Sequence, residues 1–318
     1  MAKNLPCFAR IVWHVLADAG RIEQVLCLEG SRLLRSLLPD ASFVHIHGVW
    51  EPILKQAALT ARRNRVPYCV QPHGMLDAWS MKQKRLKKTL ALHLGYRTML
   101  NGAKFLLALN ADEARLLEPL KLAAPKRIIP NGIFLEEFAD WPAKGFLARS
   151  MPELEGKRIV LFLSRLHAKK GLDLLVQAFA RLAASHPDVD LVIAGPDGGE
   201  RHKLAALIGR LDLAGRAHLI GPVYGEDKFK LLADADCFCL PSHQEGFSVA
   251  ITEALAGGLP VVISQGCHFP EVQTAQAGMV VSLDPAEIAS ALAHVLDNPA
   301  VARGMGRNGQ RLVRENYT

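Results

Sequence analysis

The stretch that decides the fold runs from residue 237 to residue 264 and reads CFCLPSHQEGFSVAITEALAGGLPVVIS. Its first residues, Cys237–Leu240, form a short apolar run typical of a buried strand, and Pro260–Ser264 has the same character. Between them, a polar loop precedes the helical apolar spacing of Ser248–Ala256. A strand, a helix and a second strand in this order predict two parallel strands connected by one helix.

The same alternation extends outward on both sides of this stretch. We predict further strands at Arg158–Ser164, Asp190–Ala194, Ala217–Gly221 and Gly278–Leu283. Helical periods lie at Gly171–Ser185, Arg201–Leu211, Glu226–Ala235 and Pro285–Leu296. Strands that alternate with helices in this way predict a mostly parallel sheet with helices on both faces, a doubly wound Rossmann-like α/β domain.

The first half of the chain repeats the theme more loosely. We predict strands at Phe43–His47, Tyr68–Gln71, Phe105–Leu109 and Arg127–Ile129, and helices at Pro52–Asn64, Gln83–Leu100 and Ala111–Leu117. Small polar or glycine turns follow these strands, where open α/β sheets place ligand-binding groups. We therefore predict α/β domains at 1–140 and 157–318, joined by a linker at 141–156 and facing a ligand-binding cleft.

The composition indicates a globular protein with an uneven charge. Hydrophobic residues make up 50% of the 318 residues, charged residues make up 22%, and the formal net charge is +7. Residues 1–150 carry a net +10 and residues 151–318 a net −3. We therefore expect the first half to face an anionic partner, such as a membrane surface, a lipid diphosphate or a nucleic acid.

Cysteine usage and hydropathy bear on metal sites and localisation. The six cysteines form no Cys-x-x-Cys pair and have no histidine at zinc spacing, so we predict no metal site and a reducing cytoplasm. Cys237 and Cys239 alternate along a strand and are expected in the core. There is no apolar signal sequence, and Val249–Ser264 is too short to span a bilayer, so we predict neither export nor a membrane span.

Two common nucleotide-binding motifs are excluded by spacing. Residues 194–199, AGPDGG, follow a predicted strand but lack the G-x-G-x-x-G spacing of dinucleotide-binding enzymes. No G-x-x-x-x-G-K-[ST] segment occurs in the sequence. The sequence therefore favours neither an NAD enzyme nor a P-loop NTPase, and no cofactor is predicted.

Two carboxylates are the first candidate site residues. Glu245 lies in the loop after Cys237–Leu240, Ser248 is placed to cap the next helix, and Glu253 lies in its first turns. Carboxylates accept hydrogen bonds from sugar hydroxyls, and the N–H groups of a helix start suit phosphate, so the segment fits a sugar nucleotide. The alternative is a solvated loop residue at Glu245 and an exposed helix position at Glu253.

Two cations follow the first strand of the same domain. Arg165 comes directly after Arg158–Ser164, and Lys170 lies at the start of the next helical period. A guanidinium and an ammonium group at a strand end suit a diphosphate whose negative charge grows as it leaves. Their neighbour Lys169 is interpreted as a solvated surface lysine.

Short motifs follow one another in a fixed order along the chain. They are SRL at 164–166, KKG at 169–171, AG at 194–195, GPV at 221–223, EGFS at 245–248, EAL at 253–255 and GLPVV at 258–262. This order closely resembles the donor-binding domain of GT-B retaining glycosyltransferases of family 4. In the first half, HIHGVW at 45–50, PHGMLD at 72–77 and IPNG at 129–132 are similar to the bacterial exopolysaccharide and lipopolysaccharide branch.

The resemblance implies roles for the donor-side residues. Glu253 would hold the nucleotide ribose, and Arg165 and Lys170 would hold the diphosphate. Glu245 would hold the donor sugar together with the backbone N–H groups of Phe247 and Ser248. The nucleotide site would further include Gly195 and Val223, the latter holding the base through its backbone.

The resemblance also implies roles in the N-terminal domain, which would form the acceptor side. His73 would approach the anomeric centre, and it is with Glu245 the implied catalytic residue; the alternative for His73 is a structural histidine. His45 and His47 lie in or at the end of a predicted strand and are interpreted as structural. Asn131 is expected to form a turn with Gly132.

The function implied is a hexosyltransferase that moves a sugar from a nucleotide-sugar donor to a glycan or polyprenyl-diphosphate-linked acceptor in surface polysaccharide synthesis. The resemblance implies that the acceptor hydroxyl attacks the sugar on the face from which the diphosphate leaves, and that no bound metal is needed. Relatives have further units before the His-Gly-Val-Trp segment, a glycine turn not found in Met1–Gln24, and a helix after Tyr317, so an incomplete N-terminal domain is implied. Two alternatives stay open: a sugar-nucleotide epimerase or hydrolase, and a non-catalytic nucleotide-sugar-binding remnant.

A basic segment lies on the presumed acceptor side. Residues 81–90, MKQKRLKKTL, place five cations within seven positions of the predicted helix Gln83–Leu100 and the residues before it. This pattern predicts a dock for anionic lipid head groups, so the protein is expected in the cytoplasm, peripherally on the inner face of the membrane. The alternative is a solvated helix face. Nucleic acid is not expected as a partner, because the segment lacks interleaved aromatic residues.

Overall fold

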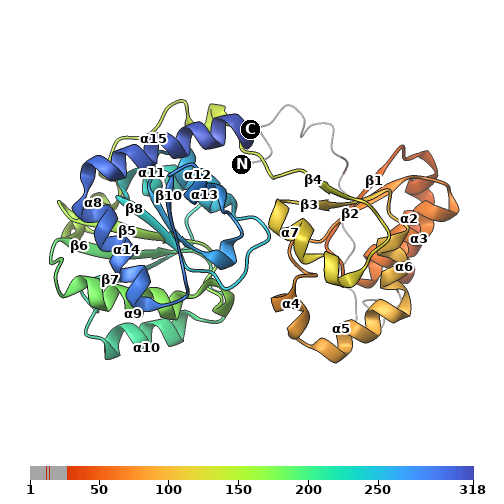
Figure 1. Cartoon of the computed structure of the whole chain (residues 1–318), viewed down its shortest axis with the longest axis horizontal. Helices are drawn as coiled ribbons and strands as arrows, with labels where there is room; N and C mark the ends of the chain where they lie inside the picture. The colour runs from red at the N-terminus through yellow and green to blue at the C-terminus, as the bar shows by residue number, and fades with distance from the viewer. Residues whose placement is uncertain (1–11, 13, 15–26) are drawn as a thin grey trace. The chain divides into compact units, whose positions relative to one another are not determined.

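The computed structural model describes residues 12, 14 and 27–318 of the chain (Figure 1). These residues form two compact units, unit 1 (Met1–Pro130) and unit 2 (Asn131–Thr318). Cys7 and all of Met1–Gln24 except Val12 and His14 lie outside the described residues, and so does the expectation about a glycine turn there.

The sheet of unit 2 has six parallel strands in the order β10-β9-β8-β5-β6-β7. They are β5 (Arg158–Leu163), β6 (Val189–Ala194), β7 (Ala217–Gly221), β8 (Cys237–Leu240), β9 (Val261–Ser264) and β10 (Gly278–Val281). Read from β7 and numbered from β5, the order is 3-2-1-4-5-6, which confirms the predicted Rossmann-like domain. All residues of β6, β8 and β9 are buried, because helices cover both faces of the sheet.

The helices of unit 2 lie in two layers on either side of this sheet (Figure 1). They are α8 (Phe146–Ser150), α9 (Leu172–Ala183), α10 (Arg201–Arg210), α11 (Glu226–Asp234), α12 (Val249–Ala256), α13 (Glu271–Thr274), α14 (Pro285–Asp297) and α15 (Pro299–Asn316). Helix α9 packs against α10 and α14, whereas α12 packs against α15. Phe162 on β5, Phe179 on α9 and Phe238 on β8 are fully buried in the core.

The described residues of unit 1 form a parallel sheet of four strands in sequential order. They are β1 (Val44–His47), β2 (Tyr68–Gln71), β3 (Phe105–Ala108) and β4 (Lys126–Ile128). Its helices are α2 (Leu28–Leu37), α3 (Pro52–Arg63), α4 (Ala78–Lys82), α5 (Arg85–Ala91), α6 (Arg97–Asn101) and α7 (Ala111–Leu116). Buried Tyr68 ties β2 to α6, because its hydroxyl donates a hydrogen bond to the carbonyl oxygen of Met99 at 2.7 Å.

The prediction of one helix over Gln83–Leu100 is wrong. Helix α4 ends before this range, at Lys82, and the chain then forms α5 and a π-type turn over Leu92–Tyr96 that leads into α6. Lys84 has a φ of 53° and Gly95 a φ of 104°, and neither value fits a right-handed helix. The basic segment 81–90 is therefore divided between two short helices.

The predicted linker, 141–156, lies within unit 2, because the chain divides between Pro130 and Asn131. Helix α8 forms part of this segment, and its Leu147 is buried. The carboxylate of Asp234 accepts hydrogen bonds from the backbone N–H groups of Gly145 at 2.6 Å and Leu147 at 2.5 Å. These bonds fix the segment to the end of α11.

The cysteines of the described chain are buried and free of disulfide bonds. They are Cys27, Cys69, Cys237, Cys239 and Cys267, which confirms the predicted core positions of Cys237 and Cys239. Burial raises the pKa of the Cys267 thiol to about 12. Within residues 27–318, metal-ligating side chains do not gather in groups of three that would suit an ion. Among the described helices, we find none with the length and apolar character needed to cross a bilayer.

Candidate functional site

The strand order of unit 2 places a switch point between β5 and β8. The chain leaves β5 toward β6 on one side, and β8 leads to β9 on the other. In open α/β sheets, ligands bind outside the carboxyl ends of the strands at such a point. Here the residues beyond the two strand ends are Ser164 and Arg165 after β5, and Pro241 and Ser242 after β8.

A short 3₁₀ helix, Ala168–Lys170, brings the lysines to this point. The carbonyl oxygen of Lys169 accepts hydrogen bonds from the Ser242 hydroxyl at 2.9 Å and from the backbone N–H of His243 at 2.7 Å. Gly171 follows with a φ of 64°, and a Cβ there would lie 2.0 Å from the carbonyl oxygen of Pro241. Glycine is therefore required for the start of α9 to lie against the end of β8.

Lys170 and Glu245 form a buried ion pair at the centre of the candidate site. The Nζ of Lys170 lies 2.6 Å from Oε1 of Glu245, and the two side chains are only 10% and 7% exposed. The backbone N–H of Glu245 donates to the carbonyl oxygen of Gly266 at 2.8 Å, which ties the loop after β8 to the turn after β9. Sequence reasoning named both residues but placed one at the diphosphate and the other at the sugar.

Glu253 forms a second ion pair, which the sequence did not reveal. Its Oε1 lies 2.6 Å from Nζ of Lys228 on α11. Burial raises the pKa of the Glu253 carboxyl, and the neighbouring Lys228 opposes that rise. No spacing rule connects residues 25 positions apart on two helices, so Lys228 had no signal in the sequence.

Arg165 is available for an anionic ligand. Its side chain is exposed, and among the described residues we find neither a hydrogen bond nor an ion pair to its guanidinium. Beside it, Gly195 has a φ of 149°, and a Cβ there would lie 1.9 Å from the carbonyl oxygen of Ser164. The ends of β5 and β6 approach closely for this reason. Val223 follows β7 and is half-buried.

The start of α12 differs from the expectation at Ser248. Ser248 occupies the N-cap position, but its side chain makes no capping hydrogen bond, so the predicted capping role is wrong. Its carbonyl oxygen instead accepts hydrogen bonds from the N–H groups of Ile251 and Thr252. The neighbouring Phe247 is half-buried and packs against Phe269 and Tyr317, with ring centroids 5.7 Å away in each case.

Gln244 is a further polar residue that sequence reasoning missed. Its side chain is buried, and its Oε1 accepts a long hydrogen bond from Nζ of Lys169 at 3.5 Å. Its Nε2 has no hydrogen-bond partner within the described part of the chain. Lys169 is therefore half-buried in this cluster and is not the solvated surface lysine that we expected.

In unit 1, three histidines gather where β1 and β2 end. The ring of His47 lies 4.0 Å from that of His45 and 5.2 Å from that of His73, measured between centroids. His45 and His47 lie in β1, as predicted, and both have exposed side chains. Partial burial lowers the pKa values of His47 and His73, and the neighbouring histidines lower them further.

Glu113 fixes the loop that carries His73, and it was also missed. Its buried carboxylate accepts hydrogen bonds from the backbone N–H of Gly74 at 2.6 Å and that of Leu109 at 2.7 Å. The residue lies in the first turn of α7, where Asn110 caps the helix by accepting a hydrogen bond from its N–H at 2.7 Å. His73 itself has a φ of 53°, a left-handed value that this anchoring maintains.

Asn131 and Gly132 do not form the predicted turn. Residues 131–134 have no turn or helix, and the next residue, Ile133, donates its N–H to the carbonyl oxygen of Tyr317 at 2.8 Å. The pair therefore lies in an extended segment beside the last residues of unit 2.

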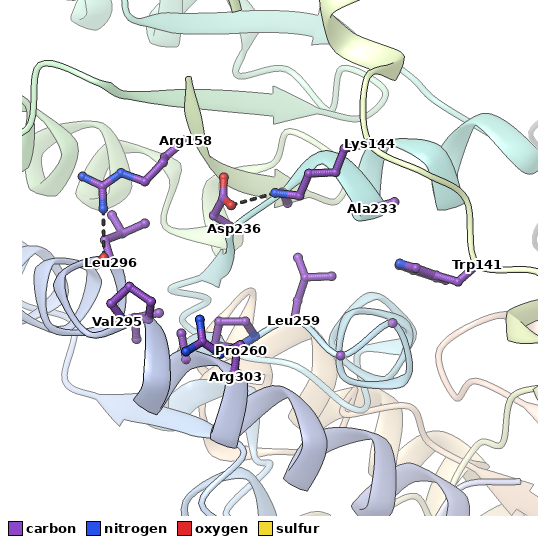
Figure 2. A pocket seen from close by; sticks show the side chains of 15 residues that line it. Trp141, Lys144, Arg158, Ala233, Asp236, Leu259, Pro260, Val295, Leu296 and Arg303 are labelled. Atoms are coloured by element: carbon purple, nitrogen blue, oxygen red, sulfur yellow. Dashed lines mark hydrogen bonds and ion pairs between the residues drawn. The ribbon is translucent and has the colours of Figure 1, made fainter. Parts of the chain in front are cut away.

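A pocket of about 390 Å³ lies in unit 2 at the ends of the strands opposite the switch-point residues (Figure 2). Arg158 begins β5, Asp236 directly precedes β8 and Pro260 directly precedes β9, so the pocket lies at the amino ends of the strands. Figure 2 shows Lys144 paired with Asp236, at 2.7 Å, and Arg158 donating to the carbonyl oxygen of Leu296, at 2.8 Å. Because these charged groups already have partners within the protein, we place the candidate site at the carboxyl ends of the strands.

Two family models match the chain. The model described as glycosyl transferases group 1 covers residues 146–312, and the model described as a glycosyl transferase 4-like domain covers residues 6–132. The phosphatidyl-myo-inositol mannosyltransferase of Mycolicibacterium smegmatis is 33% identical over 213 residues, which cover 65% of this chain and 53% of the relative. The gpi3 subunit of the phosphatidylinositol N-acetylglucosaminyltransferase of Schizosaccharomyces pombe is 26% identical over 263 residues, covering 81% and 54%. The chain thus spans about half the length of these curated relatives.

Solved structures share the fold. Sucrose-phosphate synthase from Thermosynechococcus elongatus superposes with a TM-score of 0.78 at 21% identity, over 96% of this chain and 77% of that one. Anabaena HepE in complex with UDP and glucose gives a TM-score of 0.76 at 20% identity, over 94% and 79%. Both matches cover the two α/β units, which agrees with the predicted GT-B fold.

Proposed function

This chain belongs to the glycosyl transferases group 1 family, and from that premise we propose that it moves a sugar from a nucleotide-sugar donor to a glycan or lipid-linked acceptor. The sugar keeps its anomeric configuration, as in the GT-B enzymes that the sequence resembles. Two relatives are named for phosphatidylinositol-type acceptors, which supports a glycolipid as acceptor, while surface polysaccharide remains the second acceptor class.

The observation that carries the proposal is the Lys170–Glu245 ion pair, together with the unpaired Arg165 that follows β5. A diphosphate bound at the switch point attracts both cations, and their charge stabilises it as it leaves the sugar. When Lys170 turns to the phosphate, Glu245 loses its partner and becomes an acceptor for sugar hydroxyls. Glu253 offers a second carboxylate to the ribose.

Charge stabilisation is the chemistry that these residues favour. Lys170 and Lys228 are paired with Glu245 and Glu253, and among the described residues of the site we find no nucleophile that is hydrogen-bonded to a base. The departing diphosphate then takes the proton of the acceptor hydroxyl on the same face. His73 on unit 1 is our candidate for contact with the sugar.

Unit 1 offers a surface for a membrane-borne acceptor. Leu86 and Leu90 on α5 are 87% and 59% exposed, and no residue of this helix is buried. Lys84, Arg85 and Lys87 are exposed around them, an arrangement that suits the interface of an anionic bilayer. Lys88 was expected to face lipid with the other cations of this segment. Its Nζ instead donates a hydrogen bond to the carbonyl oxygen of Ser80 at 2.7 Å.

The decisive experiment separates transfer from its alternatives. The purified chain is titrated by calorimetry with UDP, GDP and ADP, and then with sugar conjugates of the nucleotide that binds. The tightest conjugate is incubated with and without a lipid extract or glycan acceptor, and products are read by NMR, which reports the anomeric configuration. Acceptor-dependent product with a retained anomer supports the proposal. Donor conversion without acceptor indicates an epimerase or hydrolase, and binding without any turnover indicates a remnant.

The membrane surface is tested separately with vesicles. We expect co-sedimentation with phosphatidylglycerol vesicles but not with phosphatidylcholine vesicles, weakened by salt. The variants L86S/L90S and K84Q/R85Q/K87Q should both lose binding. The matched control R63Q/K121Q/R127Q removes the same charge from exposed positions elsewhere in unit 1 and should bind normally. If the control lost as much vesicle binding as the α5 variants, binding would depend on the net charge of the protein and not on α5.

A further inference from the structure

His47 and His73 share one hydrogen bond between their rings. Nδ1 of His47 on β1 lies 3.0 Å from Nε2 of His73 in the turn after β2, although the residues are 26 positions apart. A bond between two ring nitrogens requires one proton between them, so one ring donates and the other accepts. If both rings were protonated, two N–H groups would point at each other and the bond would be lost.

The bond leaves one nitrogen of His73 for other partners. Nε2 is taken by His47, and within the described residues we find no hydrogen bond to Nδ1 of His73. The loop around His73 is fixed by Glu113, whose carboxylate holds the N–H of the next residue, Gly74. Backbone and ring are therefore restrained from two sides before any ligand arrives.

We propose that His47 is a positioning residue for His73, fixing its ring and tautomer so that Nδ1 meets a hydroxyl group of the donor sugar. This inference rests on the proposed function, in which His73 contacts the sugar. The pair is useful only while it shares a single proton. Acidification that protonates both rings releases His73 and removes the sugar contact.

The surroundings keep the pair from being doubly protonated near neutral pH. The ionisable groups beside it are His45 on the same strand as His47, and Glu113 on α7, whose carboxylate is occupied by two backbone N–H groups. Partial burial disfavours charge on His47 and His73, and the neighbouring imidazoles act in the same direction.

The test compares H47A, H47N and H45N in the full chain. Imidazole nitrogen NMR reports the tautomer and the pKa of His73 without any need for activity. In H47A we expect a mixed tautomer and a higher pKa, because the substitution exposes His73 more to water and removes an imidazole whose protonated form disfavours charge on His73. In H47N an amide group remains near the position of Nδ1 and should restore most of the single tautomer. H45N removes a ring that is not hydrogen-bonded to His73 and should keep the tautomer of the parent protein.

Kinetics give the second readout. In H47A we expect kcat for sugar transfer to fall by about 10- to 100-fold, by analogy with the loss seen when the hydrogen-bond partner that orients a metal-ligating histidine is removed. The affinity for the free nucleotide should stay unchanged, and H47N should recover most of kcat. A His73 tautomer that is identical in the parent and H47A would overturn the proposal. If the parent protein transfers no sugar, the NMR result still decides it, while the proposed function fails separately.

Discussion

The ammonium group of Lys170 and the carboxylate of Glu245 lie 2.6 Å apart and are almost completely shielded from water. Each of these charges is expensive to bury alone, so each stabilises the other in the protein without ligand. A ligand that brings its own negative charge competes with Glu245 for Lys170. The ion pair is thus both part of the fold and part of the candidate binding site.

Removing one member of this pair should cost far more than removing both. We expect Glu245→Gln and Lys170→Met each to lower the free energy of unfolding by about 3–5 kcal/mol, because the remaining charge is buried without a partner. The double variant should be more stable than either single variant. Urea unfolding measures this as a double-mutant cycle. Strict additivity of the two losses would mean that the charges do not interact.

Glu253 should make nucleotide binding sensitive to acid. Its carboxyl has a raised pKa because it is buried, so it takes up a proton at a higher pH than an ordinary glutamate does. Binding that needs the carboxylate is present above this pKa and is lost as the pH falls through it. We expect Glu253→Gln to weaken binding by about 1–3 kcal/mol and to remove this pH dependence. Glu226→Gln, at an exposed position on α11, is the control for calorimetry at several pH values.

Gly195 should tolerate no side chain. At Gly195→Ala the new Cβ would lie 1.9 Å from the carbonyl oxygen of Ser164, and the φ of 149° adds strain. We expect loss of both stability and nucleotide binding. The matched control is Gly209→Ala on α10, where a Cβ meets no atom within 4 Å. That change should raise the free energy of unfolding by about 0.5–1 kcal/mol, because alanine favours a helix. Similar effects at both positions would contradict the close approach of the strand ends.

The histidine pair should make the fold acid-sensitive. His47 and His73 have pKa values below their ordinary 6.5 in the folded protein, so the unfolded chain binds more protons in that range. The free energy of unfolding should therefore decrease as the pH falls from about 6.5 through the lowered values. Thermal unfolding between pH 7 and pH 5 measures the decrease. The variant H47Q/H73Q should show a shallower dependence, and an equal slope would place the acid-sensitive groups elsewhere.

Much of the fold was readable in the sequence because parallel strands buried on both faces leave a clear pattern. The strand Ala217–Gly221 was predicted with its observed bounds, and so was Cys237–Leu240. Each is a short apolar run between a helical period and a polar turn. The candidate residues Lys170, Glu245 and Glu253 were also named, because the turns after such strands are where ligand-binding groups are expected.

The helix α15 was not predicted, and its glycines explain why. Gly306 and Gly309 lower the intrinsic helix propensity of the segment. Both have a tertiary reason: a Cβ at Gly306 would lie 2.1 Å from the carbonyl oxygen of Gly258, and one at Gly309 would lie 2.9 Å from Leu255. The helix exists because it packs closely against α12, and local sequence does not report such packing.

Partners of the site residues were missed for a related reason. Glu113 and Lys228 act on residues that are distant in the chain, so no motif contains both members of either pair. The exposure of His45 and His47 follows from which face of β1 a helix covers, and alternation along a four-residue strand did not settle that. Such relationships become visible only when the strands are placed in order.

The burial of the cysteines has a practical consequence for following this protein in motion. Thiols without access to water and with strongly raised pKa values, such as those of Cys239 and Cys267, do not react readily with maleimide reagents. After replacement of Cys7, one new cysteine on α5 and another on α10 would therefore accept dyes with little background. Energy transfer between the two dyes would then show whether the distance between these helices changes when a donor is added.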